Sequence, residues 1–353
     1  MPKPLPGRFK RILVCQLRQI GDVLLATPAI ELLDRAWPEA EIHVLTEARC
    51  APVLENNPHV DRVWALDKKR LDTLPKQLAY YRQFGRMGFD LVVDFQQLPR
   101  CRWVTLFSRA PVRLTFTPKL LRRLLYTHWT RPKDGYAAMS KASILSVLGL
   151  TWQGERPRLY LTEAERAWGR QYLQGLGVGP GDILVTLDPS HRRETRRWPA
   201  GHFARLADLA VAAEPRLKFL VLWGPGEEGL AREVAAVPAR RERLLVPERL
   251  LSLREMAAVI AQARAHLGTC SAPRHFAVAL GVASFVVLGS TSQAWTYPAP
   301  EHRDVALGLS CQPCNENSCA KGEPICLTRL TPEAVAPRFL DFLRETGEKG
   351  ARA

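Results

Sequence analysis

The chain has 353 residues, of which 46% are hydrophobic and nine are tryptophan, a composition that suits two domains of ordinary size. No apolar run approaches the ~18 residues that span a bilayer, and the N-terminal stretch MPKPLPGRFKR lacks the apolar core of a signal peptide. We therefore expect a cytoplasmic protein whose eight cysteines are mostly reduced. The formal charge of +15 indicates anionic partners (nucleic acid, acidic lipid headgroups or phosphorylated small molecules) or an arginine-rich genome.

The first half of the chain alternates apolar runs with helical patterns. Pro28 interrupts the first of these helical patterns, which predicts a kink or a short preliminary turn there. Buried strands are expected at 11–17, 41–46 and 89–95, and helices over 29–36 and 72–86.

The second half repeats this rhythm after a stretch that carries four glycines and a proline. That stretch, 173–182, is the expected linker between two domains. Strands that alternate with helices predict parallel sheets covered on both faces, hence an α/β fold of two Rossmann-like domains with the ligand in a cleft between them. Strands are expected at 182–187, 218–224, 265–269 and 283–289, and a helix over 200–213.

An acid stands where the first strand gives way to the first helix. In CQLRQIGDVLLATPAI, residues 15–30, Asp22 follows Gly21 directly after the strand. An aspartate in this place commonly caps the helix. Alternatively, it faces a ligand, because the carboxyl ends of parallel strands are where such folds bind.

The sequence resembles glycosyltransferase family 9, the ADP-heptose:lipopolysaccharide heptosyltransferases, over nearly its whole length. The resemblance implies a GT-B fold, an inverting mechanism and no catalytic metal. The matching segments occur in the order of the family: ILVCQLRQIGDVLLATPAIELLDRAWPEAEIHVLT, NPHVDRV, FDLVVDFQQ, RRWPAGHFARLADL, WGPGEEGLAREV, PRHFAVALGV, LGSTS and CQPCNENSCAKGEPIC.

The resemblance assigns roles to single residues. The acid of the family's Gly-Asp pair falls on Asp22, which is therefore expected to be the general base that deprotonates the acceptor hydroxyl. Donor-binding residues are expected at Arg196, in place of a family lysine, and at Glu227, with Glu228 as the neighbouring choice. Arg196 lies in the basic stretch DPSHRRETRRWP, residues 188–199. Arginine suits bidentate contacts to phosphate, and a solvated basic loop is the alternative for this stretch.

A second phosphate element is expected at GTCSAPRHFAVAL, where a helix begins near Pro273. Ser271 and His275 match the family pattern and, with Ala272, are predicted to bind the donor. The family acid and glycine are replaced by Cys270 and Ala272, and alanine adopts positive φ less easily than glycine.

The acceptor side departs from the family as well. Gln16 stands where the family usually has Arg or Lys, and Arg18 and Gln19 occupy a loop expected to face the acceptor. The stretch 113–133 mixes cations with Leu, Tyr and Trp, which suits a membrane surface or an anionic glycolipid, with Arg122 and Arg123 as contacts. An ordinary amphipathic helix with a basic face is the alternative for this stretch.

Half of the cysteines fall within 16 residues near the C-terminus. Their spacing permits a structural zinc or iron site, free thiols or disulfides, and none of these states is expected to take part in catalysis. The four residues are Cys311, Cys314, Cys319 and Cys326.

These observations combine into one expected function, an inverting, metal-independent transfer of heptose from ADP-heptose to a lipopolysaccharide inner-core acceptor. The enzyme would need no cofactor or nucleic acid and would lie peripherally on the inner face of the cytoplasmic membrane. Alternatives are a transferase for a different sugar or acceptor and a catalytically weakened binding protein. The expected domains are 1–175 for the acceptor, 176–335 for the nucleotide sugar, and a terminal helix and tail over 336–353, for which packing on the N-terminal domain is one possibility.

Overall fold

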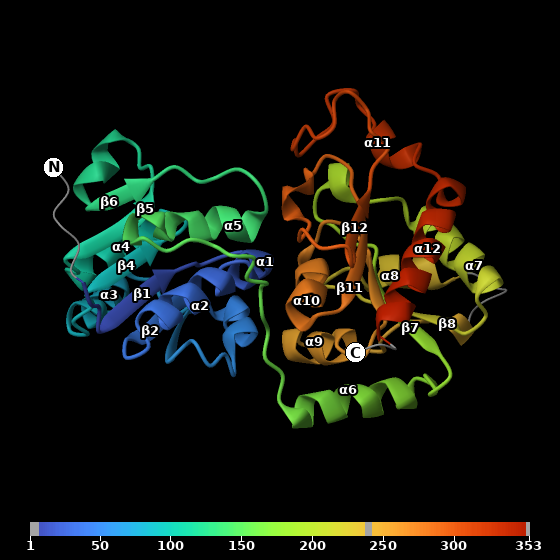
Figure 1. Ribbon diagram of the computed structural model, residues 1–353, viewed down its shortest axis with the longest axis horizontal. Helices are drawn as coiled ribbons and strands as arrows, with labels where there is room; N and C mark the ends of the chain where they lie inside the picture. Colours follow the sequence, from blue (N-terminus) through green and yellow to red (C-terminus); the bar gives the residue numbers. More distant parts are fainter. Residues whose placement is uncertain (1–6, 237–241, 351–353) are drawn as a thin grey trace. The chain divides into compact units, whose positions relative to one another are not determined.

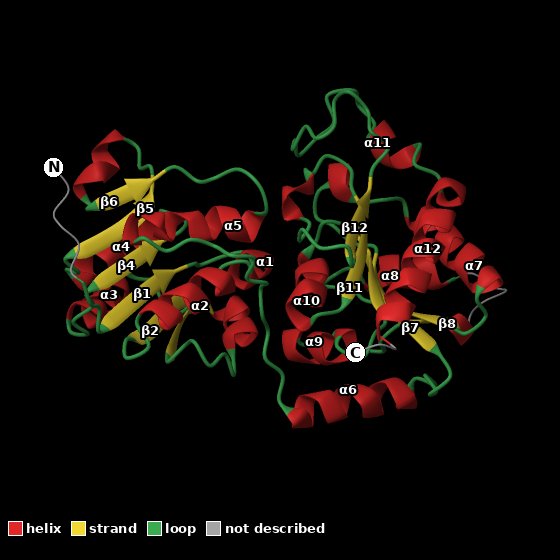
Figure 2. Ribbon diagram, in the orientation of Figure 1, coloured by secondary structure: helices red, strands yellow, loops and turns green. Residues whose placement is uncertain are grey.

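The computed structural model describes residues 7–236 and 242–350. Residues 1–6, from the N-terminal stretch considered above, and the end of the expected tail, 351–353, lie outside the described residues. The chain divides into two compact units, Met1–Tyr160 and Leu161–Ala353. In each unit a parallel sheet lies between layers of helices (Figures 1 and 2).

The N-terminal unit contains a six-stranded parallel sheet in the order β3-β2-β1-β4-β5-β6. Its inner strands are runs of Leu, Ile and Val that are buried throughout, as expected for strands covered on both faces. The strands are β1 (Arg11–Cys15), β2 (Glu41–Glu47), β3 (Arg62–Leu66), β4 (Leu91–Asp94), β5 (Val112–Phe116) and β6 (His128–Thr130). The helices are α1 (Ile20–Leu24), α2 (Thr27–Ala36), α3 (Leu74–Gly85), α4 (Pro99–Ser108) and α5 (Ala137–Ala142), with 3-10 turns η1 (Ala48–Leu54), η2 (Leu120–Leu124) and η3 (Ser143–Leu148).

The C-terminal unit repeats this topology with its own six parallel strands, in the order β12-β11-β10-β7-β8-β9. Read from its first strand, β7, this order is the same doubly wound arrangement. The strands are β7 (Ile183–Asp188), β8 (Leu217–Val221), β9 (Leu244–Leu245), β10 (Ala265–Gly268), β11 (Ala283–Val287) and β12 (His302–Val305). The helices are α6 (Glu163–Gly175), α7 (Ala200–Ala213), α8 (Glu228–Ala235), α9 (Leu253–Ile260), α10 (Ala272–Leu280), α11 (Ile325–Thr328) and α12 (Pro332–Gly350), with 3-10 turns η4 (Glu194–Arg196) and η6 (Gln293–Trp295).

The expected α/β fold is confirmed, and each predicted strand is present. Pro28 lies at the start of α2, after the separate short helix α1, so the predicted preliminary turn is confirmed. The stretch 113–133 differs from the amphipathic helix considered as an alternative, because it forms β5, η2 and β6. Edge strands such as β6 and β9 were not predicted, since two or three partly exposed residues give no hydrophobic pattern.

The boundary between the units differs from the expected one. The contact division falls at Tyr160, whereas 173–182 had been expected to be the linker. Helix α6 packs against α9 in the C-terminal unit, and the Arg254 guanidinium forms an ion pair with Glu165 at 2.6 Å between the same helices. The glycine-rich stretch is therefore the turn from α6 into β7.

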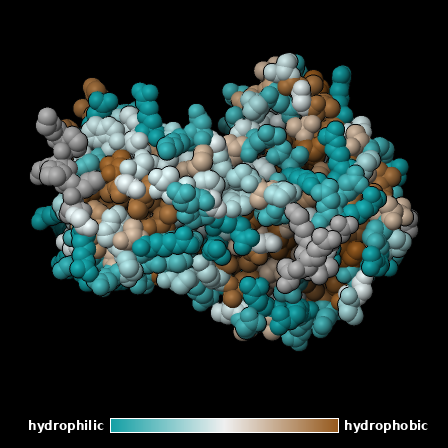
Figure 3. Space-filling model, viewed as in Figure 1, coloured by the Kyte–Doolittle hydropathy of each residue, from teal (hydrophilic) through white to brown (hydrophobic). Residues whose placement is uncertain are grey.

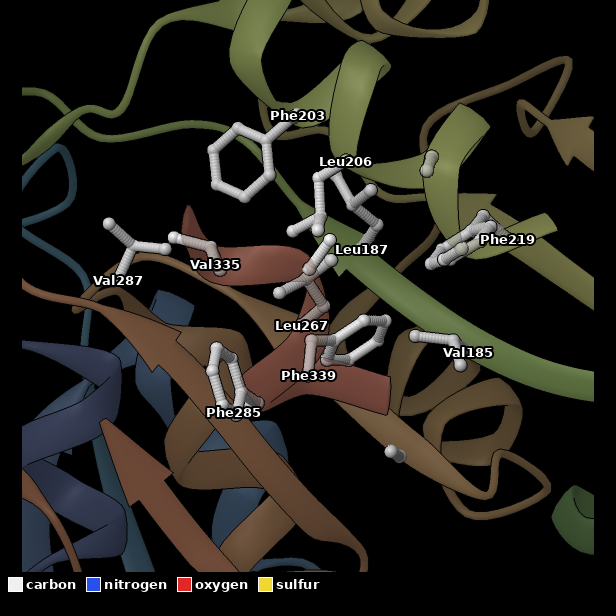
Figure 4. Close-up of a cluster of buried hydrophobic side chains, with 14 of the residues drawn as sticks. Val185, Leu187, Phe203, Leu206, Phe219, Leu267, Phe285, Val287, Val335 and Phe339 are labelled. Atoms are coloured by element: carbon white, nitrogen blue, oxygen red, sulfur yellow. The ribbon is translucent and has the colours of Figure 1, made fainter. Parts of the chain in front are cut away.

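The terminal helix α12 completes the core of the C-terminal unit. It lies against α7 and β11, and Phe339 and Phe342 are fully buried with Phe285 of the sheet (Figure 4). The terminal helix thus packs on its own unit. Among the described residues, no helix combines the length and the apolar character that crossing a membrane requires.

Candidate active site in two halves

Each sheet has a topological switch point, the place where successive crossovers leave in opposite directions. In the N-terminal unit it lies between β1 and β4, and in the C-terminal unit between β7 and β10. Doubly wound folds bind ligands outside the carboxyl ends of the strands at such points. The predicted site residues are therefore expected at these two places, one set in each unit.

In the N-terminal unit, Asp22 lies in α1, directly after the loop that follows β1. One carboxylate oxygen, Oδ2, accepts a hydrogen bond from the backbone N–H of Gln19 at 3.3 Å, so Asp22 does help to cap its helix. The other oxygen, Oδ1, lies 3.1 Å from Nζ of Lys141 in α5. The Asp22 side chain is 26% exposed and that of Lys141 15%, so the pair is accessible but sheltered.

Lys141 was not found by sequence reasoning, because it is distant from Asp22 in the chain. Its Nζ also donates a hydrogen bond to Oε1 of Gln16 at 3.1 Å and lies 5.8 Å from the centre of the Phe95 ring. Gln16 is fully buried, and its amide nitrogen donates to the carbonyl oxygen of Arg18. Gln16 thus orients Lys141 and the loop, and its burial removes it from direct contact with a ligand.

The loop that carries Arg18 and Gln19 is fixed from the neighbouring strand. Gln96, which follows β4, accepts from the backbone N–H of Leu17 at 2.9 Å and of Arg18 at 3.2 Å. The Gln19 side chain accepts a hydrogen bond from Arg49 at 3.2 Å. The Arg18 side chain is exposed. Hydrogen bonds from Gln96 thus connect the end of β4 to the loop that precedes Asp22.

Asp94, the last residue of β4, stabilises the same loop region through buried hydrogen bonds. It is fully buried, and its carboxylate accepts hydrogen bonds from the hydroxyl of Tyr126 at 2.5 Å and from the backbone N–H groups of Gln96 and Gln97. Burial raises the pKa of Asp94 above its ordinary value, and the Tyr126 bond opposes that rise. We assign Asp94 a supporting role, since none of its surface is exposed to a ligand.

In the C-terminal unit, Ser271 meets an acid from the neighbouring strand. Ser271 is the N-cap residue of α10, yet its hydroxyl donates to Asp188, the last residue of β7. Asp188 also accepts from the backbone N–H and the hydroxyl of Ser190, at 3.0 and 2.9 Å. Burial raises the pKa of Asp188 to about 6. Sequence reasoning noted the acid missing at Cys270 but not this one, which reaches the loop from another strand.

Arg196 closes the turn η4 and is half-buried, which lowers the pKa of its guanidinium. Within the described residues it forms no ion pair with a carboxylate, and its Nε has no hydrogen-bond acceptor. The thiols of Cys270 and Cys314 and the cation of Arg193 are its electrostatic neighbours. A sheltered cation without a counterion is suited to an anionic ligand.

The turn that carries Arg196 is clamped by two other loops. The hydroxyl of Thr195 donates to the carbonyl oxygen of Glu316 at 2.8 Å, and the backbone N–H of Ser290 donates to the carbonyl oxygen of Thr195 at 2.9 Å. Hydrogen bonds therefore connect the turn that carries Arg196 to the LGSTS motif and to the cysteine-rich segment.

The two candidate glutamates point in different directions. Oε2 of Glu227 accepts from the backbone N–H of Gly224 at 2.9 Å, and Glu227 interacts electrostatically with Asp188. Glu228 forms an ion pair with Arg232, one turn along α8, at 2.6 Å. Of the two glutamates, Glu227 is thus the one that interacts with Asp188.

The other residues expected in the donor site lie in α10. Ala272 is its first residue and partly exposed, so its backbone N–H is available at the helix N-terminus, whereas Pro273 has none to offer. His275 is buried, with its ring 6.0 Å from that of Trp295, and Cys270 is buried beside Val286 and Leu288. A buried His275 is placed to support the helix start.

The remaining expected residues are the two arginines of η2 and the four clustered cysteines. Arg122 and Arg123 are in η2, beside the edge strand β6, and no described contact joins them to Asp22. The four clustered cysteines are free, with Cys311 and Cys314 exposed. Among the described residues, no three or more His, Cys, Asp or Glu side chains come together closely enough to hold a metal ion.

Comparison with known proteins places this arrangement in a family. The chain is 25% identical to lipopolysaccharide heptosyltransferase 1 of Pseudomonas aeruginosa over 93% of its own length and 97% of that protein. The solved glycosyltransferase family 9 structure from Veillonella parvula is similar with a TM-score of 0.85 and 23% identity, covering 97% of this chain and 100% of that one. The ADP-heptose lipopolysaccharide heptosyltransferase II of Escherichia coli gives a TM-score of 0.77 and 18% identity, over 95% and 99%.

Both solved structures have the GT-B fold that the resemblance implied. Residues 77–324 match the family described as glycosyltransferase family 9 (heptosyltransferase). This segment includes β4 and β10, the later strand of each switch point, and every residue of the expected donor site. The chain belongs to this family and is a glycosyltransferase.

Proposed function

We propose that the protein transfers heptose from ADP-heptose to an inner-core acceptor of lipopolysaccharide, with inversion at the anomeric carbon and without a metal ion. The observation that carries the proposal is Asp22, a sheltered but accessible carboxylate at the switch point of the N-terminal unit in a family 9 chain. We take ADP-heptose and lipopolysaccharide from the name of the similar Escherichia coli enzyme.

In the proposed step, Asp22 takes the proton from the acceptor hydroxyl. The hydroxyl oxygen forms a bond to the anomeric carbon while the bond from that carbon to the diphosphate oxygen breaks, and ADP leaves with the electron pair. A positioned general base contributes roughly 10²–10⁴-fold to such a reaction. The helix-capping bond to Gln19 uses only Oδ2, which leaves Oδ1 for the proton.

Lys141 has a positioning role in this proposal. Its ammonium group lies 3.1 Å from Oδ1 of Asp22 and so fixes the orientation of the carboxylate before the acceptor binds. An arriving hydroxyl must displace Nζ from that oxygen, and Gln16 Oε1 offers Nζ a second acceptor 3.1 Å away. Lys141 thereby supplies the cation that position 16 lacks.

The leaving diphosphate is stabilised by cations and backbone donors of the C-terminal unit. Arg196, the α10 N-terminus at Ala272 and the hydroxyl of Ser271 bind the phosphates, with His275 supporting the start of α10, and the free Oε1 of Glu227 binds ribose hydroxyls. Fixed donors of this kind do the work that a metal does in other transferases. The exposed loop with Arg18 and Gln19 contacts the acceptor, so residues of the N-terminal unit bind the acceptor and those of the C-terminal unit the nucleotide sugar.

The cysteine-rich segment is structural in this proposal, since Glu316 within it holds Thr195 next to Arg196. We propose free thiols there, and a structural zinc or iron is the alternative. Elemental analysis of protein purified without chelator decides between them: a zinc or iron content of about one equivalent supports the metal, and less than about a tenth rejects it.

A different sugar or acceptor is the second candidate, which the departures from the family pattern at Gln16, Arg18 and Gln19 suggest; the changes at Gln16, Cys270 and Ala272 suggest a weakened catalyst. A binding protein without turnover is the third. We place the protein in the cytoplasm, peripherally on the inner face of the membrane where a glycolipid acceptor is found, with no nucleic-acid partner.

One experiment separates these functions. Purified protein is incubated with ADP-heptose, ADP-glucose or a UDP-sugar, with and without core glycolipid, and nucleotide release is followed. We expect ADP release from ADP-heptose that depends on the glycolipid. Release from another nucleotide sugar alone would identify a different transferase, and binding of ADP without release from any donor would indicate the binding protein.

A further inference from the structure

The turn η2 exposes an unusual amount of apolar surface. Leu120, Leu121 and Leu124 are 78%, 85% and 87% exposed, and no residue of the turn is buried. Figure 3 shows hydrophobic atoms projecting from this outer corner of the N-terminal unit, where η2 lies beside β6 in Figure 1. Isolated exposed leucines are ordinary, but three on one short turn form a patch that a soluble protein usually covers.

The patch is surrounded by positive charge. The stretch 109–133 contains seven Lys or Arg residues and no Asp or Glu. Lys119 and Arg123 are exposed next to the leucines, and the Arg123 guanidinium lies 5.8 Å from the centre of the half-exposed Trp129 ring. Leucine beside Arg, Lys and Trp is the composition of a surface that binds an anionic lipid interface.

The turn is presented by a fixed framework. On one side, Thr117 donates its backbone N–H to the carbonyl oxygen of Thr130 at 2.9 Å. On the other, Nε of Arg113 donates to the carbonyl oxygen of Leu125 at 2.6 Å, and the backbone N–H of Arg113 to the hydroxyl of Thr127 at 2.8 Å. Both ends of η2 are thus tied to the sheet, so the exposed leucines are held out by the fold.

We infer that η2 is a membrane-insertion element: Leu120, Leu121 and Leu124 enter the boundary between headgroups and acyl chains of an anionic bilayer, while Lys119, Arg122 and Arg123 contact lipid phosphates. This deepens the peripheral location stated above and assigns Arg122 and Arg123 to the bilayer. It does not depend on which sugar is transferred, because no residue of the insertion element belongs to either half-site.

The test is sedimentation with vesicles that contain no glycolipid, which excludes binding through the acceptor. Vesicles of phosphatidylglycerol and phosphatidylethanolamine are compared with vesicles of phosphatidylcholine. We expect the wild-type protein to bind the anionic vesicles at least ~10-fold more tightly, because the basic residues attract them. Salt above 0.15 M should weaken binding, since exposed charges are then screened over less than about 8 Å.

The leucines are tested by the double variant Leu121→Ser, Leu124→Ser. We expect it to bind anionic vesicles at least ~10-fold more weakly, while nucleotide release with a water-soluble, deacylated acceptor stays at the wild-type level. Leu74→Ser is the matched control, because Leu74 is 67% exposed in the same unit at the start of α3. The charge-reversal variant Arg122→Glu, Arg123→Glu should also lose vesicle binding.

Three results would overturn the inference. They are wild-type protein that ignores anionic vesicles, a leucine variant that binds them as wild type does, and a leucine variant whose only change is the loss of a dimer seen for the wild type in analytical ultracentrifugation. The last result would assign the patch to a second copy of the chain. If the wild type releases no nucleotide, the proposed function is contradicted and this inference is unaffected.

Discussion

At the scale of single residues, the N-terminal half-site contains the ion pair between Asp22 and Lys141. The Asp22 side chain is 26% exposed and that of Lys141 15%, so the pair is more sheltered than the surface pairs that contribute about 0–1 kcal/mol to folding. In the proposed reaction, Lys141 places the carboxylate. A positioning role predicts that loss of Lys141 lowers kcat, whereas a structural role predicts that it lowers stability.

Lys141→Met tests the positioning role. We expect kcat to fall roughly 10-fold, less than the ~10²–10⁴-fold cost of losing a general base, because Asp22 keeps its place but loses its orientation. The KM for ADP-heptose and the melting temperature should change little, and Lys141→Arg should restore part of kcat. A variant that melts much earlier, with normal kcat below its melting temperature, would show a structural role instead.

Asp188 makes a pH-dependent prediction for donor binding. Burial raises its pKa from 3.8 to about 6, so the carboxylate gains a proton as the pH falls through 6. The loss of its negative charge beside Ser271 removes repulsion of the diphosphate, and the affinity for ADP-heptose should rise roughly 3- to 10-fold from pH 7.5 to 5.5. Burial lowers the pKa of neighbouring His191 to about 4, so His191 stays neutral over this range.

Calorimetry with ADP-heptose in EDTA measures this effect. Asp188→Asn should bind with an affinity that hardly changes between the two pH values, because the amide has no proton to gain. An unchanged pH dependence in the folded Asn variant would assign the titration to another group.

Some of these residues could be found in the sequence and others could not. Asp22 and Glu227 each follow a glycine after a predicted strand, where local pattern suggests a site, and Arg196 was selected through the family resemblance. Lys141 and Asp188 become candidates only through their tertiary neighbours. Lys141 is 125 residues from its partner Gln16, and Asp188 accepts from Ser271, which follows the neighbouring strand β10. Nothing in their local sequence distinguishes them from ordinary surface or strand-end residues.

At the scale of elements, the turn η4 depends on the loop after β11. Gly289 lies so close to this turn that a Cβ atom there would be 2.2 Å from the carbonyl oxygen of Thr195 and 2.9 Å from Cδ1 of Leu327. The backbone oxygen cannot move without displacing Thr195 and therefore Arg196. The close approach explains why a glycine is needed between β11 and the LGSTS serine.

Gly289→Ala should weaken ADP binding at least ~10-fold and lower stability by roughly 1–3 kcal/mol, the usual range for overpacking. Denaturant unfolding and calorimetry measure the two effects. Gly201→Ala in α7 is the matched control, since a Cβ there has no neighbour within 4 Å and alanine favours a helix. Equal ADP affinity in Gly289→Ala and the wild type would contradict the dependence of Arg196 on this contact.

Elements were predictable where burial is continuous. The inner strands β1, β4, β7, β10 and β11 were found because they are mostly apolar and are buried along nearly their whole length. The edge strands β6 and β9 were missed because their side chains are partly exposed, and the role of α6 was missed because a glycine-rich turn resembles a linker.

At the scale of the whole molecule, the chain contains the same strand order twice, and each copy collects its candidate residues at its own switch point. A hydrogen-bonded bridge crosses each point, from Gln96 to the Arg18 loop in one unit and from Asp188 to Ser271 in the other. The proposed general base, Asp22, and the proposed phosphate-binding cation, Arg196, thus belong to different units. Each half can be disabled by itself.

Turnover by Asp22→Asn in the presence of EDTA tests the central claim, metal-independent transfer with Asp22 as the base, most directly. The variant keeps a side chain that can accept from Gln19, and losing the cap entirely would cost only about 1 kcal/mol, so it should fold. We expect wild-type protein to release ADP from ADP-heptose with core glycolipid in EDTA, and Asp22→Asn to be ~10²–10⁴-fold slower while binding ADP normally. Near-normal turnover by the folded variant, or a wild-type enzyme that is inactive until Mg²⁺ is added, would contradict the account.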